Sequence, residues 1–457
     1  MHDPVSRRAA MVTALAGITA VATADRATAQ TRRANTLRPD ALRPNTLRPD
    51  APDDQSSALQ RAIDQAAARR VPLTLPGGTF RASGLTLPAG AQILGTRGAT
   101  RLLLNGDAPL VAARGAAAVT LAGLVLDGAG RRGNAALIDL ASVEGLRISD
   151  CEIKDANGVA LKLTEVEGVV SGNRIERSDD VALHALDARG LTISGNTIRG
   201  AGNGGIHIWR SQKGDDGSIV ADNRIEGILA RGGGSGENGN AINVYRAGNV
   251  VVRGNRIRDA AFSAVRGNAA SGIQILDNTC NAIGEVALYA EFDFEGAVIA
   301  GNVVNDAALG VAVTNFKQGG RLGVVQGNIL RNITRRRPAG TDPNDGYGIG
   351  IGVEADTAVT GNVIDNAAVI GIAVGAGTYL RDVTVSGNVV RGTPTGIAVS
   401  VAAGAGAAAI TGNLIAGAKP GARTGALIGM AWDKVASTDL ARDAARFPQL
   451  TVSGNRT

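Results

Sequence analysis

A recurring asparagine constrains the fold of this chain more than any other feature. Eleven asparagines stand in one local frame, with Gly or Asp directly before each and Val or Ile three positions before each. Most of them are 23 to 27 residues apart. A fixed period of this length is typical of a solenoid, in which each repeat forms one coil. The asparagines are Asn173, Asn196, Asn223, Asn255, Asn278, Asn302, Asn328, Asn362, Asn388, Asn413 and Asn455.

The residues between the asparagines indicate strands rather than helices. Apolar residues alternate with polar ones and are rich in Val and Ile, whereas a helical repeat would show a period of about 3.6 residues. Stacked coils pair their strands in parallel at about 4.8 Å, which places equivalent side chains above one another. Each asparagine amide would then bond the amides above and below it. We therefore predict an all-β fold, a parallel β-helix, in which the asparagines are structural.

The two cysteines fit this repeat without forming a disulfide. Cys151 stands where the preceding coil should have its asparagine, and Cys280 stands at an inward aliphatic position. Five coils separate them, which is about 24 Å along the axis, whereas a disulfide needs α-carbons within about 7 Å. We expect two free thiols, with Cys280 buried as a small hydrophobic residue.

The first 29 residues have the pattern of an export signal. Arg7 and Arg8 precede an uncharged stretch, residues 9–24, that is too short to span a bilayer, and small residues at 27–29 suit a signal peptidase. Paired arginines before a mildly apolar stretch resemble a twin-arginine signal, and an ordinary secretory signal with two arginines is the alternative. We expect a periplasmic or secreted protein with no transmembrane segment once the signal is removed.

Residues 30–52 are expected to form an extended linker between the signal and the folded part, residues 53–457. A Leu-Arg-Pro phrase recurs there every five residues, and proline at this spacing blocks both helices and sheets. Of the net charge of +6, residues 30–50 contribute +3 and residues 1–29 contribute +1, which leaves +2 for the rest of the chain. Such a nearly neutral body argues against nucleic acid as a partner.

Both ends of the repeat region have the composition of caps. Residues 59–70 have helical composition and lead into a Leu-Pro-Gly-Gly-Thr-Phe strand at 75–80, while Trp432 and residues 434–446 stand near the other end. An open solenoid end exposes unpaired backbone and apolar interior, so it needs a cover. We expect an N-terminal capping helix and a C-terminal cover that includes Trp432.

The N-terminal pattern is similar to the cap and first coil of pectate-lyase-like proteins. Residues 53–457 resemble the pectin-lyase-like superfamily of right-handed parallel β-helices, and with the export signal the chain resembles the family of twin-arginine-exported β-helix repeat proteins. This resemblance implies a fold and a location but no particular activity. Twin-arginine export also suggests a bound cofactor, but the sequence contains no cofactor motif, so we identify none.

A second strand in each coil has the form Gly-Ile-x-Val-x, and alternate residues of such a strand point outward. We predict two outward rows along the solenoid axis. One contains Lys162, His184, Trp209, Tyr245, Asn268, Tyr289 and Thr314, and its neighbour contains Ala160, Ala182, His207, Asn243, Arg266, Ala287 and Ala312. Later coils have only Gly, Ala and Ser at these positions, so we expect function in the first two-thirds of the solenoid.

Aromatic rings in a line favour a polysaccharide as the partner of this face. The apolar faces of sugars stack on such rings, and interleaved cationic and amide side chains suit sugar hydroxyls and carboxylates. Elongated turns at 231–240 and 335–345 would wall the groove. The alternative is that the aromatic residues pack beneath these turns. The candidate substrate-binding residues are Lys162, Trp209, Asn243, Tyr245, Arg266, Tyr289 and Glu291.

Four residues are candidates for catalysis. Asp179 and Asp180 lie just before His184, and His207 follows one coil later. Carboxylates beside histidines can act as general acid and base on a glycosidic bond, and the alternative is that the two aspartates cap a turn. The paired aspartates resemble those of polygalacturonase-like hydrolases, but the Asn-x-Asp, Gly-His-Gly and Arg-x-Lys motifs of that resemblance are missing, as is the Asp-Pro-His pattern of alginate epimerases.

An acidic stretch, residues 291–295, is a second candidate site. Alternation predicts three carboxylates on one face and two phenylalanines opposite. The carboxylates could bind Ca²⁺ or supply a base beside Tyr289. Carboxylates two positions apart on a strand are about 6.7 Å from each other, so one ion would not ligate all three. A solvated strand edge is the alternative.

Three functions remain open from the sequence. The first is a lyase, hydrolase or epimerase acting on an acidic glycan, with the histidines and aspartates as its catalytic groups. The second is a non-catalytic glycan-binding or envelope-structural β-helix, and the third is an exported protein that carries a cofactor. We expect a monomer in each case.

Overall fold

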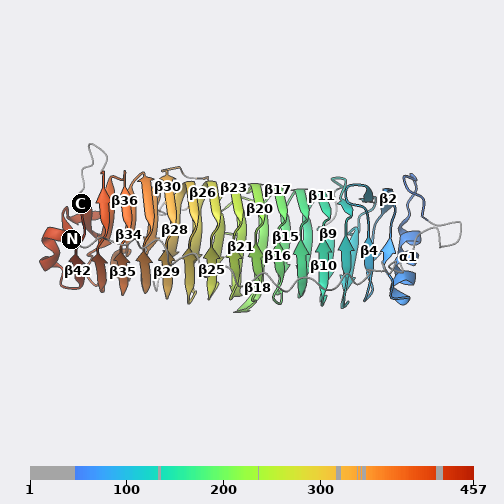
Figure 1. The fold of residues 1–457 in the computed structure, drawn as a ribbon, viewed down its shortest axis with the longest axis horizontal. Helices are drawn as coiled ribbons and strands as arrows, with labels where there is room; N and C mark the ends of the chain where they lie inside the picture. The colour runs from blue at the N-terminus through green and yellow to red at the C-terminus, as the bar shows by residue number, and fades with distance from the viewer. Residues whose placement is uncertain are drawn as a thin grey trace, which may run out of the picture. The chain divides into compact units, whose positions relative to one another are not determined.

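The computed structural model describes residues 47–131, 135–234, 236–314, 321–336, 338–339, 341, 346–417 and 426–457. The predicted signal and the linker up to residue 46 lie outside the described residues. The strands stack side by side along one axis, and each coil contributes up to three of them (Figure 1). Every strand pairing among the described residues is parallel except that of the last hairpin. The structure confirms the predicted parallel β-helix.

The first face is a single sheet of 15 strands. Apolar residues such as Val170, Ile193 and Val220 pair across neighbouring coils and are fully buried. The strands are β1 (Leu73–Thr74), β4 (Gln92–Leu94), β7 (Thr120–Ala122), β10 (Leu146–Ser149), β13 (Gly168–Ser171), β16 (Thr192–Ser194), β19 (Ile219–Ala221), β22 (Val251–Arg253), β25 (Ile273–Leu276), β27 (Ala297–Ala300), β29 (Gly323–Gln326), β32 (Thr357–Thr360), β35 (Val383–Ser386), β38 (Ala408–Thr411) and β42 (Leu450–Ser453).

The second face follows the asparagine of each coil. Its strands are β2 (Gly78–Ala82), β5 (Thr100–Leu104), β8 (Val125–Asp127), β11 (Glu152–Ala156), β14 (Arg174–Ser178), β17 (Thr197–Ala201), β20 (Arg224–Ile228), β23 (Arg256–Ala260), the first parts of β26 (Thr279–Glu291) and β28 (Val303–Thr314), β30 (Ile329–Ile333), β33 (Val363–Ala367), β36 (Val389–Arg391) and β39 (Leu414–Ala416). β26 and β28 continue across the bend into the third face, because they pair with strands of both faces.

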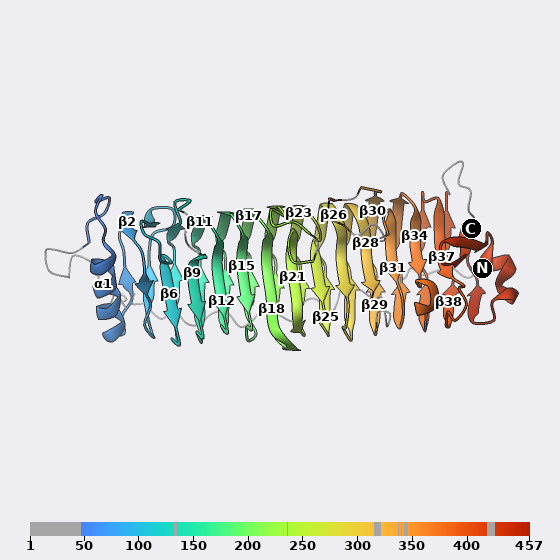
Figure 2. The ribbon, with the colours of Figure 1, turned by 180° about the vertical axis from the view of Figure 1, so that it is seen from behind.

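The third face contains every candidate residue that lies on a strand. Apart from the second parts of β26 and β28, its strands are β3 (Leu85–Thr86), β6 (Val111–Arg114), β9 (Ala136–Ala141), β12 (Val159–Thr164), β15 (Val181–Leu186), β18 (Gly204–Asp215), β21 (Asn240–Gly248), β24 (Val265–Asn268), β31 (Ile349–Val353), β34 (Ile370–Val374), β37 (Thr395–Ser400) and β40 (Leu427–Ala431). β18 extends beyond its neighbours, as Figure 2 shows.

The asparagines form a continuous ladder at the corner between the first and second faces. Nδ2 of each asparagine before the last, Asn455, donates to Oδ1 of the asparagine one coil further on, as from Asn196 to Asn223 at 3.0 Å. The backbone N–H of Asn196 donates to the same oxygen at 2.9 Å. The other Nδ2 proton goes to the backbone carbonyl of Val170 on the preceding coil. These buried amides therefore have their partners within the ladder, as predicted.

Both cysteines occupy the predicted positions. The backbone N–H of Cys151 donates to Asn173 Oδ1 at 2.9 Å, so Cys151 begins the asparagine ladder. Cys280 pairs in register with Ile257 and Val304 in the core. Both thiols are buried and free, which confirms the prediction. Burial raises the pKa of Cys151 to about 11 and that of Cys280 to about 12.

A helix covers the N-terminal end, as predicted. α1 (Ser56–Ala68) buries Leu59, Ala62, Ile63 and Ala66 at the end of the stack (Figure 2). The Asp54 carboxylate accepts from the backbone N–H and the hydroxyl of Ser56, at 3.1 and 2.6 Å, and this interaction fixes the start of the helix. The last residues of the predicted linker also pack here, because Leu47 is buried in the core.

The C-terminal end is covered by residues 434–446 but not by Trp432. β41 (Lys434–Ser437) folds back antiparallel to β40, and α2 (Leu440–Asp443) and η3 (Ala444–Arg446) follow. Leu440 is fully buried in the core. Trp432 is 61% exposed and lies instead against Gly377, just beyond β34. The expectation for Trp432 is wrong because the hairpin turn carries its ring to the side of the solenoid.

Candidate functional site

Outward side chains of the third face form two rows along the solenoid, and together these rows contain all seven candidate substrate-binding residues. Strand register places Lys162 beside His184 and His184 beside His207. We call the rows the histidine row and the tryptophan row. The histidine row contains Lys162, His184, His207, Asn243, Arg266, Tyr289 and Ala312, and the tryptophan row contains Thr164, Leu186, Trp209, Tyr245, Asn268, Glu291 and Thr314.

The predicted rows are wrong by two residues at three places. Trp209 lies beside Leu186 rather than His184, and Tyr289 lies beside Arg266 rather than Asn268. Thr314 lies beside Glu291 rather than Tyr289. A shift of two residues keeps every side chain on its own side of the strand, so alternation cannot detect it. The predicted second row also included Ala160, Ala182 and Ala287, which are buried where the strands of the third face begin.

Four rings pack against one another at the centre of this face. Trp209 stacks on His207 with ring centroids 4.7 Å apart and planes 7° apart, and His184 meets Trp209 edge-on at 5.1 Å. Tyr245 meets Trp209 edge-on at 5.7 Å, and the Arg246 guanidinium lies 4.7 Å from the Tyr245 ring centroid. The aromatic side chains are therefore largely partners of one another, which leaves little free ring face at this point.

The two histidines share a hydrogen bond in a buried setting. His184 Nδ1 and His207 Nδ1 are 3.4 Å apart, so one of them donates to the other. His207 is 2% exposed, and a side chain at Gly204 would come within 2.2 Å of its Nε2. Burial, and then His184, lowers the pKa of His207 to about 3. Burial and the charge of Lys162 also lower the pKa of His184, whereas Asp180 raises it. Both rings are neutral at pH 7.

The two candidate aspartates hold a loop over the face. Arg231, in the loop 229–239, pairs with Asp179 at 2.7 Å. Asn203 connects the same loop to Asp180, because its Nδ2 donates to Asp180 Oδ1 at 3.0 Å and its Oδ1 accepts from the Gly232 N–H at 2.6 Å. These contacts give both aspartates a positioning role at the turn.

The loop also closes over the histidine row, where the elongated turn was expected to wall a groove. Asn243 is 3% exposed, and its Nδ2 donates to the Gly236 carbonyl at 2.7 Å. Asn240, at the end of the loop, donates to the same carbonyl at 2.8 Å. The centre of the face is thus a covered cluster rather than an open groove in this structure.

Arg266 and Glu291 form a buried ion pair beside this cluster. Arg266 Nε donates to Glu291 Oε1 at 2.5 Å, and Asn268 Nδ2 donates to the same oxygen at 2.9 Å. Arg266 also lies 3.6 Å from the Glu285 carboxylate and 5.1 Å from the centroid of the Tyr289 ring. Burial lowers the pKa of Arg266, but the charge of Glu291, its hydrogen bond and the charge of Glu285 together outweigh burial, and the pKa is raised. Arg266 therefore joins two buried carboxylates and one aromatic ring.

The predicted shared face of the carboxylates in 291–295 is wrong. β26 ends at Glu291, and Phe292 and Asp293 turn the chain with φ values of 47° and 35°. Glu291 is 1% exposed, whereas Asp293 and Glu295 are exposed and form ion pairs elsewhere. Alternation holds only while the strand continues. Within the described ranges, no group of three His, Cys, Asp or Glu side chains is placed to hold a metal ion such as Ca²⁺.

Several buried polar atoms on this face have no hydrogen-bond partner among the described residues. They are His207 Nε2, Trp209 Nε1, Arg266 Nη1 and Glu291 Oε2. Buried polar atoms in folded proteins are nearly always bonded to protein or water. These four atoms lie in or beside the covered cluster. Contacts within the described protein therefore do not satisfy the hydrogen bonding of this part of the solenoid.

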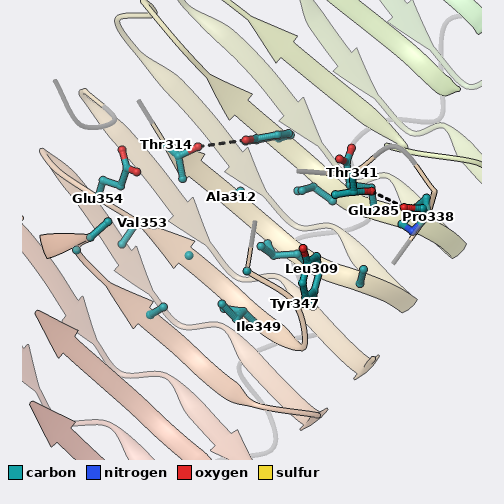
Figure 3. A pocket seen from close by; sticks show the side chains of 18 residues that line it. Glu285, Leu309, Ala312, Thr314, Pro338, Thr341, Tyr347, Ile349, Val353 and Glu354 are labelled. Carbon is teal, nitrogen blue, oxygen red and sulfur yellow. Dashed lines mark hydrogen bonds between the residues drawn. The ribbon is translucent and has the colours of Figure 1, made fainter. Parts of the chain in front are cut away.

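An open hollow lies next to the covered cluster, over β26, β28, β31 and β34. Its volume is about 260 Å³, and its lining includes Tyr289 and Tyr347. Thr314 and Glu354 lie on one side of it, and Thr341 and Glu285 lie on the other (Figure 3). The Thr314 hydroxyl donates to the Tyr289 hydroxyl at 3.5 Å. We call this space the Tyr289 hollow. Its lining includes the small residues Ala312, Gly352 and Ala373, and also the larger apolar residues Val286, Leu309 and Ile349.

The sequence analysis missed most of the residues that line this hollow. Glu285 stands at the first position of the repeated Gly-Ile-x-Val-x phrase, which is Gly or Ala in most coils. An acidic residue at this position could have indicated a functional role for Glu285. Thr341 lies in the turn 335–345, which was predicted to wall a groove, and Tyr347 follows this turn. The hollow also extends over the later coils, where we expected no function. Small side chains on those strands leave space, and the neighbouring turns enclose it.

The fold is that of a right-handed parallel β-helix. A family model described as a right handed beta helix region matches residues 131–237 and 169–329. No curated protein matches the sequence. No helix in the described part of the chain has the length and apolar character needed to cross a membrane.

Solved structures with a similar fold come from bacteria and a bacteriophage. The A-module of a mannuronan C-5 epimerase from Azotobacter vinelandii is 19% identical, with 71% of this chain and 100% of that chain covered and a TM-score of 0.49. The catalytic unit of an alpha-1,3-glucanase from Streptomyces thermodiastaticus is 16% identical, with 93% and 69% covered and a TM-score of 0.47. Gene product 12 of bacteriophage phi29 is 13% identical, with 89% and 54% covered and a TM-score of 0.52.

Proposed function

We propose that the protein binds a polysaccharide on the third face, with the Tyr289 hollow as the main binding position. The observation that carries this proposal is the composition of the hollow. Two tyrosines, two carboxylates and two threonine hydroxyls line it together with small and larger apolar residues. Sugars present apolar ring faces that stack on aromatic side chains, and hydroxyls that bond to carboxylates and hydroxyl groups.

The position of the hollow along the solenoid supports a chain-like ligand. Coils repeat at about 4.8 Å, so the four strands beneath the hollow present equivalent positions in a straight line. The long turn before β31 borders the hollow, since Pro338, Thr341 and Tyr347 all line it. A polymer lying along the axis can contact this turn and the strands of all four coils.

Binding of the purified full chain to a panel of polysaccharides tests the proposal. The panel contains neutral glucans, polygalacturonate and alginate, each with and without calcium. Tyr347→Ala should weaken binding about tenfold, or ~1.4 kcal/mol, because it removes one ring from the lining. Tyr379→Ala is the matched control, since Tyr379 is also half-exposed but does not line the hollow. Absence of binding to every member of the panel would exclude the proposal.

Catalysis on an acidic glycan, by a lyase, hydrolase or epimerase reaction, is the second candidate function. The observation that favours it is that Asp180 lies near enough to His184 to raise its pKa, on the face that also carries Lys162. A neutral imidazole next to a carboxylate can serve as a general base. Asp180→Asn and His184→Gln should then abolish turnover with binding unchanged, and equal turnover in all variants would leave only the binding function.

We further propose export through the twin-arginine pathway to the periplasm or the exterior. The basis is the Arg7-Arg8 pair before an uncharged stretch. Replacing both arginines by lysine should retain the protein in the cytoplasmic fraction. If the doubly substituted protein is exported normally, an ordinary secretory signal carries it instead.

A further inference from the structure

Trp432 borders a second hollow on the third face. This space has a volume of about 510 Å³ and lies over β34, β37 and β40. We call it the Trp432 hollow. Its floor includes Ala373, Gly375 and Ala398, and Trp432 and Met430 form one side. Ala373 and Gly375 also line the Tyr289 hollow, so the two hollows are continuous along the axis. Five coil steps separate β26 from β40, which is about 24 Å.

The ring of Trp432 is held in place but not covered. A side chain at Gly377 would come within 2.3 Å of two ring carbons of Trp432, so the ring lies directly on the backbone of Gly377. The side chain is nevertheless 61% exposed, the second-highest exposure among the large exposed hydrophobic residues of the described chain. An aromatic side chain fixed along one edge and open on the rest presents a preformed stacking surface.

The backbone of Trp432 lies in the left-handed region. Trp432 and Asp433 form the turn between β40 and β41, and Trp432 has a φ of 57°. This region disfavours bulky side chains, and Trp432 is the bulkiest of the 26 non-glycine residues of the described chain that adopt a positive φ. Glycine or asparagine at this turn position would avoid the strain, so folding alone gives no reason for a tryptophan here.

The lining of the Trp432 hollow determines the charge of a ligand that fits it. Ser400 and Asp433 are its polar side chains, and none of its lining residues in the described chain is Lys, Arg or His. A uronate carboxylate that bound on this floor would lose its hydration and would find no cationic side chain as a partner, so its binding would be unfavourable. A sugar ring without charge stacks on Trp432 and retains its hydroxyls toward Ser400 and solvent.

We infer that Trp432 is a sugar-stacking residue and that the groove from the Tyr289 hollow to Trp432 takes an uncharged sugar chain. This inference rests on the proposed polysaccharide-binding function. It adds a second binding position to that function. The sugar chain would lie parallel to the solenoid axis, and its sugars would be uncharged where the chain crosses the last coils.

Titration with neutral and charged oligosaccharides tests this assignment. The probes are hexasaccharides of β-1,4-glucan, β-1,3-glucan and α-1,4-glucan, with oligogalacturonate and oligoalginate as charged counterparts. Binding of a neutral probe should change the fluorescence of the wild-type protein and should weaken about tenfold in Trp432→Ala. Trp432→Tyr should retain affinity within about threefold, because a ring remains. Val435→Ala, which removes an exposed apolar side chain of the same hairpin outside the hollow, should bind like the wild type.

Each outcome separates the inference from the function on which it rests. If Tyr347→Ala weakens binding but Trp432→Ala does not, the function stands and the inference is wrong. If charged oligosaccharides bind and neutral ones do not, the inference is wrong in its ligand class. If no oligosaccharide binds, both fall. If Trp432→Ala instead changes the oligomeric state measured by light scattering and leaves sugar binding intact, the hollow is a protein contact and the inference is overturned.

Discussion

Asn223 donates from Nδ2 to Oδ1 of Asn255 at 3.0 Å, although the two residues are 32 positions apart. The loop 229–239 lies between them, yet this rung has the same length as rungs between shorter coils, such as 3.0 Å from Asn255 to Asn278. The extra residues leave the coil at the bend between the second and third faces and return there. The ladder therefore fixes one corner of each coil from Cys151 onward and leaves the bend between the second and third faces free to vary.

Removal of an internal rung should destabilise the solenoid strongly. Asn302→Ala leaves the backbone N–H and the Nδ2 of Asn278 without the oxygen that both use. Two buried donors without a partner cost about 3 kcal/mol, which chemical denaturation monitored by circular dichroism would measure. Asn455→Ala, at the partly buried last rung, should cost about 1 kcal/mol. Equal losses for the two variants would contradict a structural ladder.

Stability should decrease as the pH falls below neutrality because of His207. Its pKa is about 3 in the folded protein against 6.5 for an ordinary histidine. Between these values the unfolded chain binds a proton that the folded chain does not, so folding becomes less favourable as pH decreases and is unaffected by this group above pH ~6.5. From pH 7 to pH 5 the loss should be about 2 kcal/mol.

Urea unfolding at both pH values would measure this loss in the wild type and in His207→Phe. Phenylalanine retains a ring against Trp209 but has no proton to bind, so most of the pH dependence should disappear. The contribution of His184, whose pKa is also lowered, remains in the variant. An unchanged pH dependence in His207→Phe would show that another group is responsible.

Loss of the Arg231–Asp179 ion pair should open the loop 229–239 without unfolding the solenoid. The pair is more than half exposed on both sides, so it contributes at most about 1 kcal/mol, or up to about fivefold in the population of the open loop. Cleavage by a glutamyl endopeptidase at Glu237 should accelerate by this factor in Arg231→Ala. Arg258→Ala removes two exposed ion pairs on the second face and should leave the cleavage rate unchanged. Faster cleavage in both variants would indicate general destabilisation.

Neither cysteine should react with a thiol reagent in the folded protein. Burial excludes the reagent, and the raised pKa values of about 11 and 12 keep Cys151 and Cys280 protonated at neutral pH. Ellman's reagent should therefore detect no thiol in native protein and two per chain in denaturant without reductant. A single reactive thiol in the native state, or none after denaturation, would contradict the structure.

The sequence was sufficient to predict the solenoid because its repeat is enforced by stacking. Asn173 and its equivalents are buried and must bond to one another, so substitution at these positions is costly and the period remains visible. The same reasoning placed Cys151 and Cys280 correctly. The register of the third face could not be predicted from the sequence. Pairing His184 with Trp209 or with His207 gives the same alternation of inward and outward residues.

The candidate site was predicted only in part, for a different reason. Which residues lie outward follows from alternation, but whether they are accessible depends on the turns between strands. Nothing in the periodicity reveals that Gly236 covers Asn243, or that Tyr347 and Glu354 border a hollow with Tyr289. Trp432 was assigned to the end of the solenoid because its turn has no equivalent in the repeat. These positions depend on the path of irregular segments, which local sequence specifies weakly.

The asparagine ladder also has a polarity. Every rung donates from the earlier coil to the later one, from the Cys151 N–H at one end to Asn455 at the other. A synthetic coil with an asparagine in the right frame could therefore be appended after Asn455, where its side-chain oxygen would receive the next pair of protons. The coils before Cys151 stack without this ladder, because a thiol cannot supply that oxygen. The ladder itself can therefore be lengthened in one direction only.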